Sequence, residues 1–148
     1  MKFNGWISPK NEISLSDLIN DLDQDSKMGA ITTFTGLVRD ISDYNEVKVK
    51  ALEVEAWVEK GEIMRDIAKD IGVRYNLLGM RIVHLEGMLE IGDPIVYVVI
   101  SSIHRKEAFD ALEDAINAYK NKSPVWKKEI YEDGNSHWIT TAHSHAEE

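Results

Sequence analysis

The alternation of apolar and polar residues in the first third of the chain predicts short strands around one amphipathic helix. The opening FNGWIS, residues 3–8, has the composition of a strand. Ser14 can cap a helix in which Asp17 is the third residue and leucines and isoleucine form one apolar face. The β-branched run AITTFTG, residues 30–36, and VKVKALEVEAW, residues 47–57, predict two strands separated by the turn-forming DISDYNE.

The rest of the chain continues with two helices and four strands. Isoleucines recur at helical spacing over residues 58–74, and residues 104–121 carry one apolar helical face. Pro124 forbids continuation of the second helix, because proline has no backbone N–H to donate. Strands are expected at about residues 80–87, 94–102, 125–132 and 137–141, the first two being joined by the turn LEIGDP.

The resulting order, β-α-β-β-α-β-β-α-β-β, predicts an α+β fold in which helices pack against a mainly antiparallel sheet, in a hammerhead-like arrangement. A length of 148 residues suits a single domain that can bury its own core. We expect this domain to span residues 1–141 and the polar residues 142–148 to form a C-terminal tail.

Composition narrows the function. The chain has no cysteine, which excludes disulfides, thiolate metal ligands, a nucleophilic thiol and a persulfide relay. Its net charge of −9 argues against nucleic acid as a partner, which would require a positive surface. The N-terminus has no apolar signal core, and no apolar run approaches the ~18 residues of a membrane span, so we expect a cytoplasmic protein without membrane contact.

Two groups of basic residues follow predicted strands. Arg39 leaves a strand in TGLVRD, where an arginine can equally be a solvated edge charge. His104 and Arg105 open the helix after the apolar run YVVISS. Basic residues in a first turn oppose the helix dipole, so they are hard to explain as structural. Free amide donors together with positive side chains would bind an anion such as phosphate.

Further bases lie near the end of that helix and beyond it. Lys120 stands in the last turn, where a cation also stabilises the helix without any other function. Lys127 and Lys128 occupy successive positions of a predicted strand, so at most one of them faces a given pocket. His143 and His145 could form a metal-binding pair, or simply belong to a frayed terminus.

Two long motifs together resemble the family of molybdopterin synthase large, catalytic subunits. GAITTFTGLVRD is similar to that family's strand and loop, which ends in valine and arginine. LEIGDPIVYVVISSIHRKEAFDALEDAINAYKNKSPVWKKE resembles its longest signature, with a GD turn, S-x-HR-x-x-AF, a helix ending in lysine, and P-x-WK-[KR]-E. The closing GNSHWI resembles its final strand, so the likeness covers about residues 29–139 in the family's order and spacing.

The chain departs from the family pattern at two places. Many relatives have a lysine where this chain has Leu37, which removes one anion contact beside Arg39. The family often has Glu-His-Tyr, followed shortly by methionine, where this chain has Glu55-Ala56-Trp57. No role of that histidine can therefore be transferred.

The resemblance implies a reaction, partners and site residues. Such enzymes insert two dithiolene sulfurs into a cyclic pyranopterin monophosphate to give molybdopterin, for the molybdenum cofactor, without a metal or cofactor of their own. The sulfur arrives as a thiocarboxylate on the Gly-Gly C-terminus of a small ubiquitin-like subunit, in a heterotetramer built on a central homodimer. Lys120 and Lys127 match the family's catalytic lysines. The implied substrate-binding residues are Arg39, His104, Arg105, Lys128 and Glu129.

Two other functions stay open at this stage. One is a non-catalytic dimeric scaffold of the same fold that binds phosphate or a ubiquitin-like tail. The other is a phosphate-ester hydrolase, which would require a metal cluster or an activated nucleophile, and the sequence offers no convincing set. His104 and Lys120 are sixteen residues apart on one predicted helix, hence ~24 Å apart at ~1.5 Å per residue. We therefore expect a pocket shared between the two subunits of a dimer.

Overall fold

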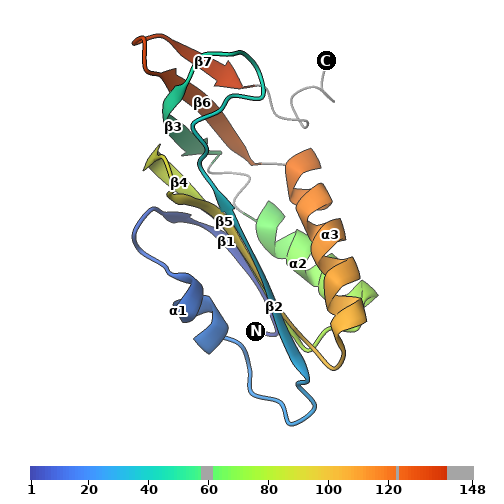
Figure 1. Ribbon diagram of the computed structural model, residues 1–148. Helices are drawn as coiled ribbons and strands as arrows, with labels where there is room; N and C mark the ends of the chain where they lie inside the picture. The colour runs from blue at the N-terminus through green and yellow to red at the C-terminus, as the bar shows by residue number, and fades with distance from the viewer. Residues whose placement is uncertain (58–61, 123, 140–148) are drawn as a thin grey trace.

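The computed structural model of the chain describes residues 1–57, 62–122 and 124–139 (Figure 1). The strands are β1 Phe3–Pro9, β2 Ala30–Leu37, β3 Val49–Ala56, β4 Gly79–Glu90, β5 Pro94–Ser102, β6 Val125–Tyr131 and β7 Ser136–Ile139. The helices are α1 Leu15–Asn20, α2 Ile63–Arg74 and α3 Arg105–Asn121. The predicted order of elements is confirmed, and so is the α+β class with a mainly antiparallel sheet.

The sheet contains one parallel pair that the sequence pattern did not predict. Six strands follow the order β2-β5-β4-β3-β6-β7 with antiparallel neighbours, and β1 pairs with β4 in parallel. Along β4, Met80–Glu86 pair with β1 and Gly87–Glu90 pair with β3. Gly87 has a φ of 120°, a conformation that side chains disfavour. The long strand thus exchanges one neighbour for another at a glycine.

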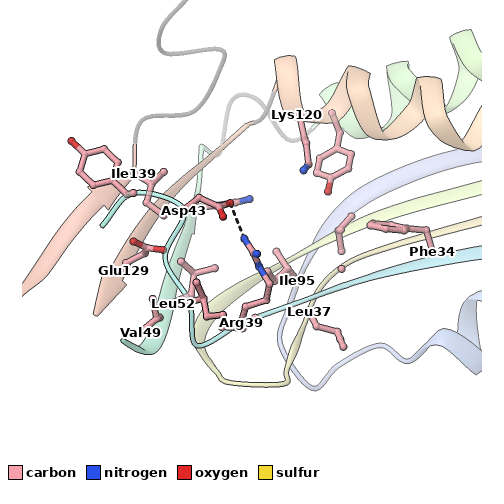
Figure 2. Close-up of a pocket in the computed structure, with 17 residues that line it drawn as sticks. Phe34, Leu37, Arg39, Asp43, Val49, Leu52, Ile95, Lys120, Glu129 and Ile139 are labelled. Atoms are coloured by element: carbon pink, nitrogen blue, oxygen red, sulfur yellow. Dashed lines mark hydrogen bonds and ion pairs between the residues drawn. The ribbon is translucent and has the colours of Figure 1, made fainter. Parts of the chain in front are cut away.

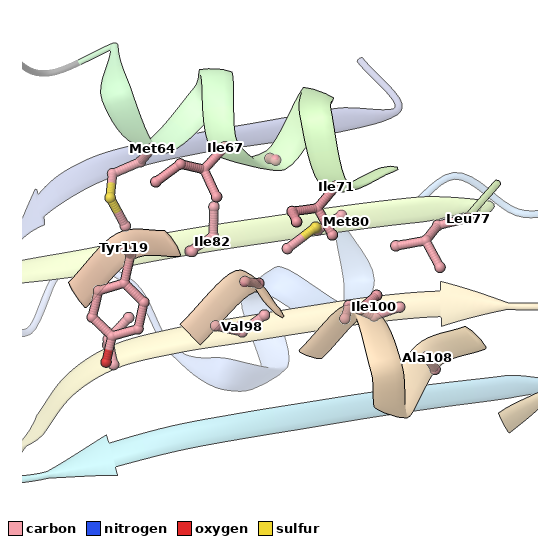
Figure 3. Close-up of a cluster of buried hydrophobic side chains, with 14 residues drawn as sticks. Met64, Ile67, Ile71, Leu77, Met80, Ile82, Val98, Ile100, Ala108 and Tyr119 are labelled. Carbon is pink, nitrogen blue, oxygen red and sulfur yellow. The ribbon is translucent and has the colours of Figure 1, made fainter. Parts of the chain in front are cut away.

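Helices cover both faces of the sheet near β1, β4 and β5. The helices α2 and α3 lie on one face, over a core that includes Met80, Ile82 and Val98 from the strands (Figure 3). The short helix α1 buries Leu18 against the opposite face (Figure 1). As predicted, Ser14 caps α1: its hydroxyl accepts a hydrogen bond from the Asp17 amide at 3.1 Å, and the Asp17 carboxylate accepts one from the Ser14 amide at 3.0 Å.

The strands β3, β6 and β7 lie at the end of the molecule where α3 finishes (Figure 1). A third apolar cluster, which includes Leu52, Val54 and Leu89, holds β3 and β4 together there. This arrangement places the start of β6 next to the last turn of α3, because only Lys122, residue 123 and Pro124 separate the two elements. The fold therefore forms a corner between the helix end and the strands.

Some boundaries differ from the sequence prediction. The strand β4 continues to Glu90, three residues further than expected, because Leu89 pairs with Leu52 on β3. The LEIGDP turn is correspondingly shorter. Parts of the expected helix at 58–74 and of the last strand lie outside the described residues, as do His143 and His145. Within the described ranges, none of the helices has the length and apolar character to span a membrane.

Candidate active site

A cavity of about 460 Å³ opens at the corner where α3 ends and the strands begin (Figure 2). Residues from β2, the loop after it, β3, β5, α3, β6 and β7 line it. Its size is within the usual range for a small-molecule site. Apolar side chains form most of the wall, and the charged residues that line it are Arg39, Asp43, Lys120, Lys127 and Glu129.

Two lysines from different elements face this cavity. Lys120 enters it from the last turn of α3, on the helix side of the cavity (Figure 2). Lys127 lines it from β6 and is half-buried. Burial, and then the nearby charge of Lys120, lower the pKa of Lys127 to about 8. At neutral pH the cavity thus holds a positive charge that is poorly solvated, which favours an anionic ligand.

Arg39 lies on the opposite side of the cavity, just after β2 (Figure 2). Its guanidinium donates to the Asp43 carboxylate at 2.7 Å. The two side chains are 60% and 84% exposed, so the pair adds little to stability and can open for a ligand. The preceding Val38 is buried and its amide donates to the Asp93 carbonyl at 3.0 Å, which fixes the start of the loop.

The carboxylate of Glu129 is buried and already has two hydrogen bonds. Its Oε1 accepts a hydrogen bond from the Ser42 hydroxyl at 2.6 Å and one from the Tyr131 hydroxyl at 2.8 Å. The Ser42 hydroxyl also accepts from the backbone amides of Tyr44 and Asn45, at 3.0 and 3.3 Å. These contacts favour a positioning role for Glu129, in which it holds the loop that carries Arg39, over direct substrate binding.

Lys128 points away from the cavity, as the alternation of side chains along β6 requires. Its ammonium lies 3.1 Å from the Glu53 carboxylate and 5.2 Å from the centre of the Trp138 ring. The structure therefore does not bring Lys128 together with Lys127, and its expected contact with substrate has no support from the cavity.

His104 and Arg105 line a second cavity, of about 420 Å³, at the other end of α3. His104 is the N-cap residue, and its side chain makes no capping hydrogen bond. Gly29 lies against this helix start so closely that a Cβ there would be 2.1 Å from the Ile103 carbonyl oxygen. Within one chain, the two basic groups predicted from the sequence thus occupy separate sites, at opposite ends of one helix.

Comparison with known proteins decides the family. The sequence profile described as MoaE protein matches residues 9–122. The chain belongs to this family. A "Molybdopterin synthase catalytic subunit" from Thermoplasma volcanium is 36% identical over 130 residues, which is 87% of this chain and 93% of that protein.

Solved structures agree with the MoaE assignment. The crystal structure of molybdopterin synthase from Staphylococcus aureus matches with a TM-score of 0.80 at 33% identity, over 90% of this chain and 96% of that one. The complex of subunits 1 and 2 of molybdopterin-converting factor from Helicobacter pylori shares the fold, with a TM-score of 0.66 at 17% identity, over 92% of this chain and 88% of that one.

The MoaE match covers only part of the candidate site. Residues 9–122 include Arg39 and Lys120 but end before Lys127 on β6, so the role of Lys127 depends on the cavity geometry. The sequence did not predict that Ser42 and Tyr131 hold Glu129. One hydroxyl lies in a loop and the other on a strand, and the spacing of these residues along the chain forms no recognisable motif. Among the described residues, no group of three or more histidine, aspartate or glutamate side chains could hold a metal ion.

The hydrogen bonds of Ser42 provide a first prediction. In Ser42→Ala the amides of Tyr44 and Asn45 and the Glu129 carboxylate lose a shared partner. We expect the free energy of unfolding to fall by about 1–3 kcal/mol, and hydrogen exchange of both amides to accelerate. Chemical denaturation and amide exchange measure these effects.

Ser42→Thr keeps the hydroxyl and should behave like the unmodified chain. Ser136→Ala, at an exposed serine on β7, is the matched control for loss of a hydroxyl. Unchanged exchange at Tyr44 and Asn45 in Ser42→Ala would show that Glu129 does not hold the loop through Ser42.

Proposed function

We propose that this chain is the catalytic subunit of a molybdopterin synthase. It converts a cyclic pyranopterin monophosphate into molybdopterin by inserting two dithiolene sulfurs from the C-terminal thiocarboxylate of a small ubiquitin-like partner. The observation that carries this proposal is that Lys120, Lys127 and Arg39 line one cavity in a member of the MoaE family. Relatives at 36% and 37% identity are named molybdopterin synthase catalytic subunits, which supports it.

The two lysines act on the thiocarboxylate. Their ammonium groups bind this anion and stabilise the oxyanion that forms when its carbonyl carbon is attacked or hydrolysed. Because the pKa of Lys127 is about 8, the side chain is mostly protonated at pH 7 yet gives up its proton more easily than an ordinary lysine. This property suits Lys127 to be a general acid, while Lys120 places a second amine in the cavity.

The sulfur must come from another molecule, because the chain has no cysteine. A flexible Gly-Gly tail is narrow enough to enter a cavity of about 460 Å³ and carry its thiocarboxylate to the lysines. The Helicobacter pylori structure is a complex of two subunits, which is compatible with a small partner. We place this chain in the cytoplasm, as a homodimer with one partner at each end.

The phosphate of the substrate needs cations of its own, and His104 and Arg105 are the candidates. They lie at the far end of α3 from Lys120 within one chain. An isologous dimer can bring the start of α3 in one subunit next to the end of α3 in the other, twice by symmetry. We propose that each working site combines His104 and Arg105 of one subunit with Lys120 and Lys127 of its partner.

Reconstitution tests the activity. The full chain, mixed with the cyclic pterin substrate and thiocarboxylated partner in the presence of a chelator, should form the dithiolene product. Lys120→Ala and Lys127→Ala should each lower turnover at least tenfold, since loss of one preorganised charge donor typically costs ~10²–10³ in rate. Product is measured by mass spectrometry, and melting temperature in parallel.

Lys122→Ala is the matched control, because this lysine is exposed at the C-cap of α3 and does not line the cavity. A non-catalytic scaffold would bind the partner and form no product. Full activity without the partner, or strict dependence on added metal, would contradict the proposal. Normal turnover with a lowered melting temperature in Lys120→Ala would assign that lysine to helix stability instead.

Subunit mixing tests the shared site. His104→Ala and Lys120→Ala proteins, each inactive alone, should regain about one working site per mixed dimer after subunit exchange, because one site then has both groups intact. Exchange is verified by mass spectrometry of differently labelled chains. If mixed dimers form and remain inactive, each site lies within a single chain.

A further inference from the structure

His84 is a fully buried histidine that the functions above do not use. It lies on β4 with 0% of its surface exposed. Across the sheet it pairs with Val96 of β5, which in turn pairs with Gly36 of β2. Val96 and Gly36 both line the lysine cavity. Directly paired residues share a face of the sheet, so His84 lies one strand deeper, beneath the wall of this cavity.

The histidine ring is held in one tautomer. Its Nδ1 lies 3.0 Å from the Leu85 carbonyl oxygen, which can only accept a hydrogen bond. Nδ1 therefore carries the proton, and Nε2 of the neutral ring presents a lone pair. Within the described part of the chain, Nε2 is buried and has no hydrogen-bond partner. Such atoms are uncommon in folded proteins and call for a donor nearby.

The groups around the ring identify that donor. The Tyr119 ring of α3 packs edge-on, with the two ring centres 6.1 Å apart. Burial is the main reason that the pKa of His84 is lowered to about 3, and the charge of the nearby Lys127 on β6 is the second reason. Lys120 is near enough to Lys127 for its charge to help lower the pKa of Lys127. Glu86, two residues further along β4, already accepts a hydrogen bond from the Ala56 amide at 3.2 Å.

Lys127 is the strongest available donor among these groups. Its amine carries up to three hydrogens on a flexible stem, and it is already desolvated at the wall of the same cavity. Burial raises the pKa of Tyr119 to about 12, so that side chain stays a neutral and weaker donor. The ring of His84 remains neutral throughout the physiological range, and its lone pair is always available.

We propose that His84 is a positioning residue for Lys127: the amine, which makes no hydrogen bond to Nε2 in this structure, turns to donate one and is thereby held at the floor of the cavity. This role of His84 rests on the proposed function of Lys127. It deepens that function by naming the group that orients the amine. A fixed acceptor below the amine leaves its other hydrogens directed to the ligand. It also stabilises the charged form of a lysine that burial would otherwise discharge.

Two variants separate the two ring nitrogens. His84→Asn keeps a donor for the Leu85 carbonyl and removes the acceptor at the Nε2 position. His84→Gln places an amide oxygen near that position. In the full chain with labelled lysine, we expect the pKa of Lys127 to fall by up to about one pH unit in His84→Asn. It should stay near its original value in His84→Gln.

Turnover should follow the same pattern. The alkaline limb of the kcat profile should move to lower pH in His84→Asn, with little change in KM, and return in His84→Gln. An equal pKa of Lys127 in all three proteins would overturn the proposal, because a purely structural role changes the melting temperature and leaves the amine alone. The titration of Lys127 needs no substrate. If its pKa shifts in His84→Asn but the chain shows no turnover, the result contradicts the proposed function and leaves the role of His84 standing.

A measurement on the intact histidine covers the case in which neither variant folds. The ¹⁵N resonance of His84 Nε2 reports whether its lone pair accepts a hydrogen bond. In Lys127→Met, which keeps the length of the side chain and removes the donor, this resonance should move toward that of a free lone pair. An unchanged resonance would mean that another donor, such as a buried water, satisfies Nε2, and would overturn the proposal.

Discussion

The candidate site depends on a poorly solvated lysine ammonium that lies next to a second cation. Burial is the larger cause of the lowered pKa of Lys127, and the charge of Lys120 is the second. If water reached Lys127, the burial would be lost and the solvent would screen the charge of Lys120. The cavity wall must therefore be built well enough to keep water from Lys127, and most features of the fold near the corner contribute to that wall.

Chain connectivity brings the two lysines together. They are seven positions apart, yet one ends a helix and the other lies on a strand, because Pro124 stops α3 and lets β6 begin at once. At the opposite end of α3, His104 and Arg105 line a separate cavity. A straight helix of 17 residues cannot offer both ends to one small ligand, which is the physical reason for invoking a second subunit.

Much of this architecture could be predicted from the sequence. Helical periodicity and β-branched runs are local signals, and they placed the described helices and strands in the right order. The alternation rule also predicted that Lys127 and Lys128 would not share a pocket, and the structure separates them. The resemblance to the large-subunit family also indicated Lys120 and Lys127 as the site lysines.

Other features depend on contacts between distant segments, which no local pattern encodes. The parallel pairing of β1 with β4 and the change of neighbour at Gly87 are of this kind. The expectation that Glu129 binds substrate stays a prediction, and the sequence did not indicate that the Ser42 hydroxyl, 87 positions away, donates to its Oε1. His84 stands within an apolar run of the sequence, and only the tertiary structure shows that its Nε2 has no hydrogen-bond partner among the described residues.

The most direct test of this account is the pKa of the Lys127 amine, measured by NMR in the full chain and in Lys120→Met. The account predicts a midpoint near 8, well below the ordinary lysine value of about 10.4. Removing Lys120 should raise it only in part, since burial remains. Because the unfolded chain binds more protons between these two values, the free energy of unfolding should also rise with pH across that window. A midpoint at the ordinary lysine value, unmoved by Lys120→Met, would contradict the account.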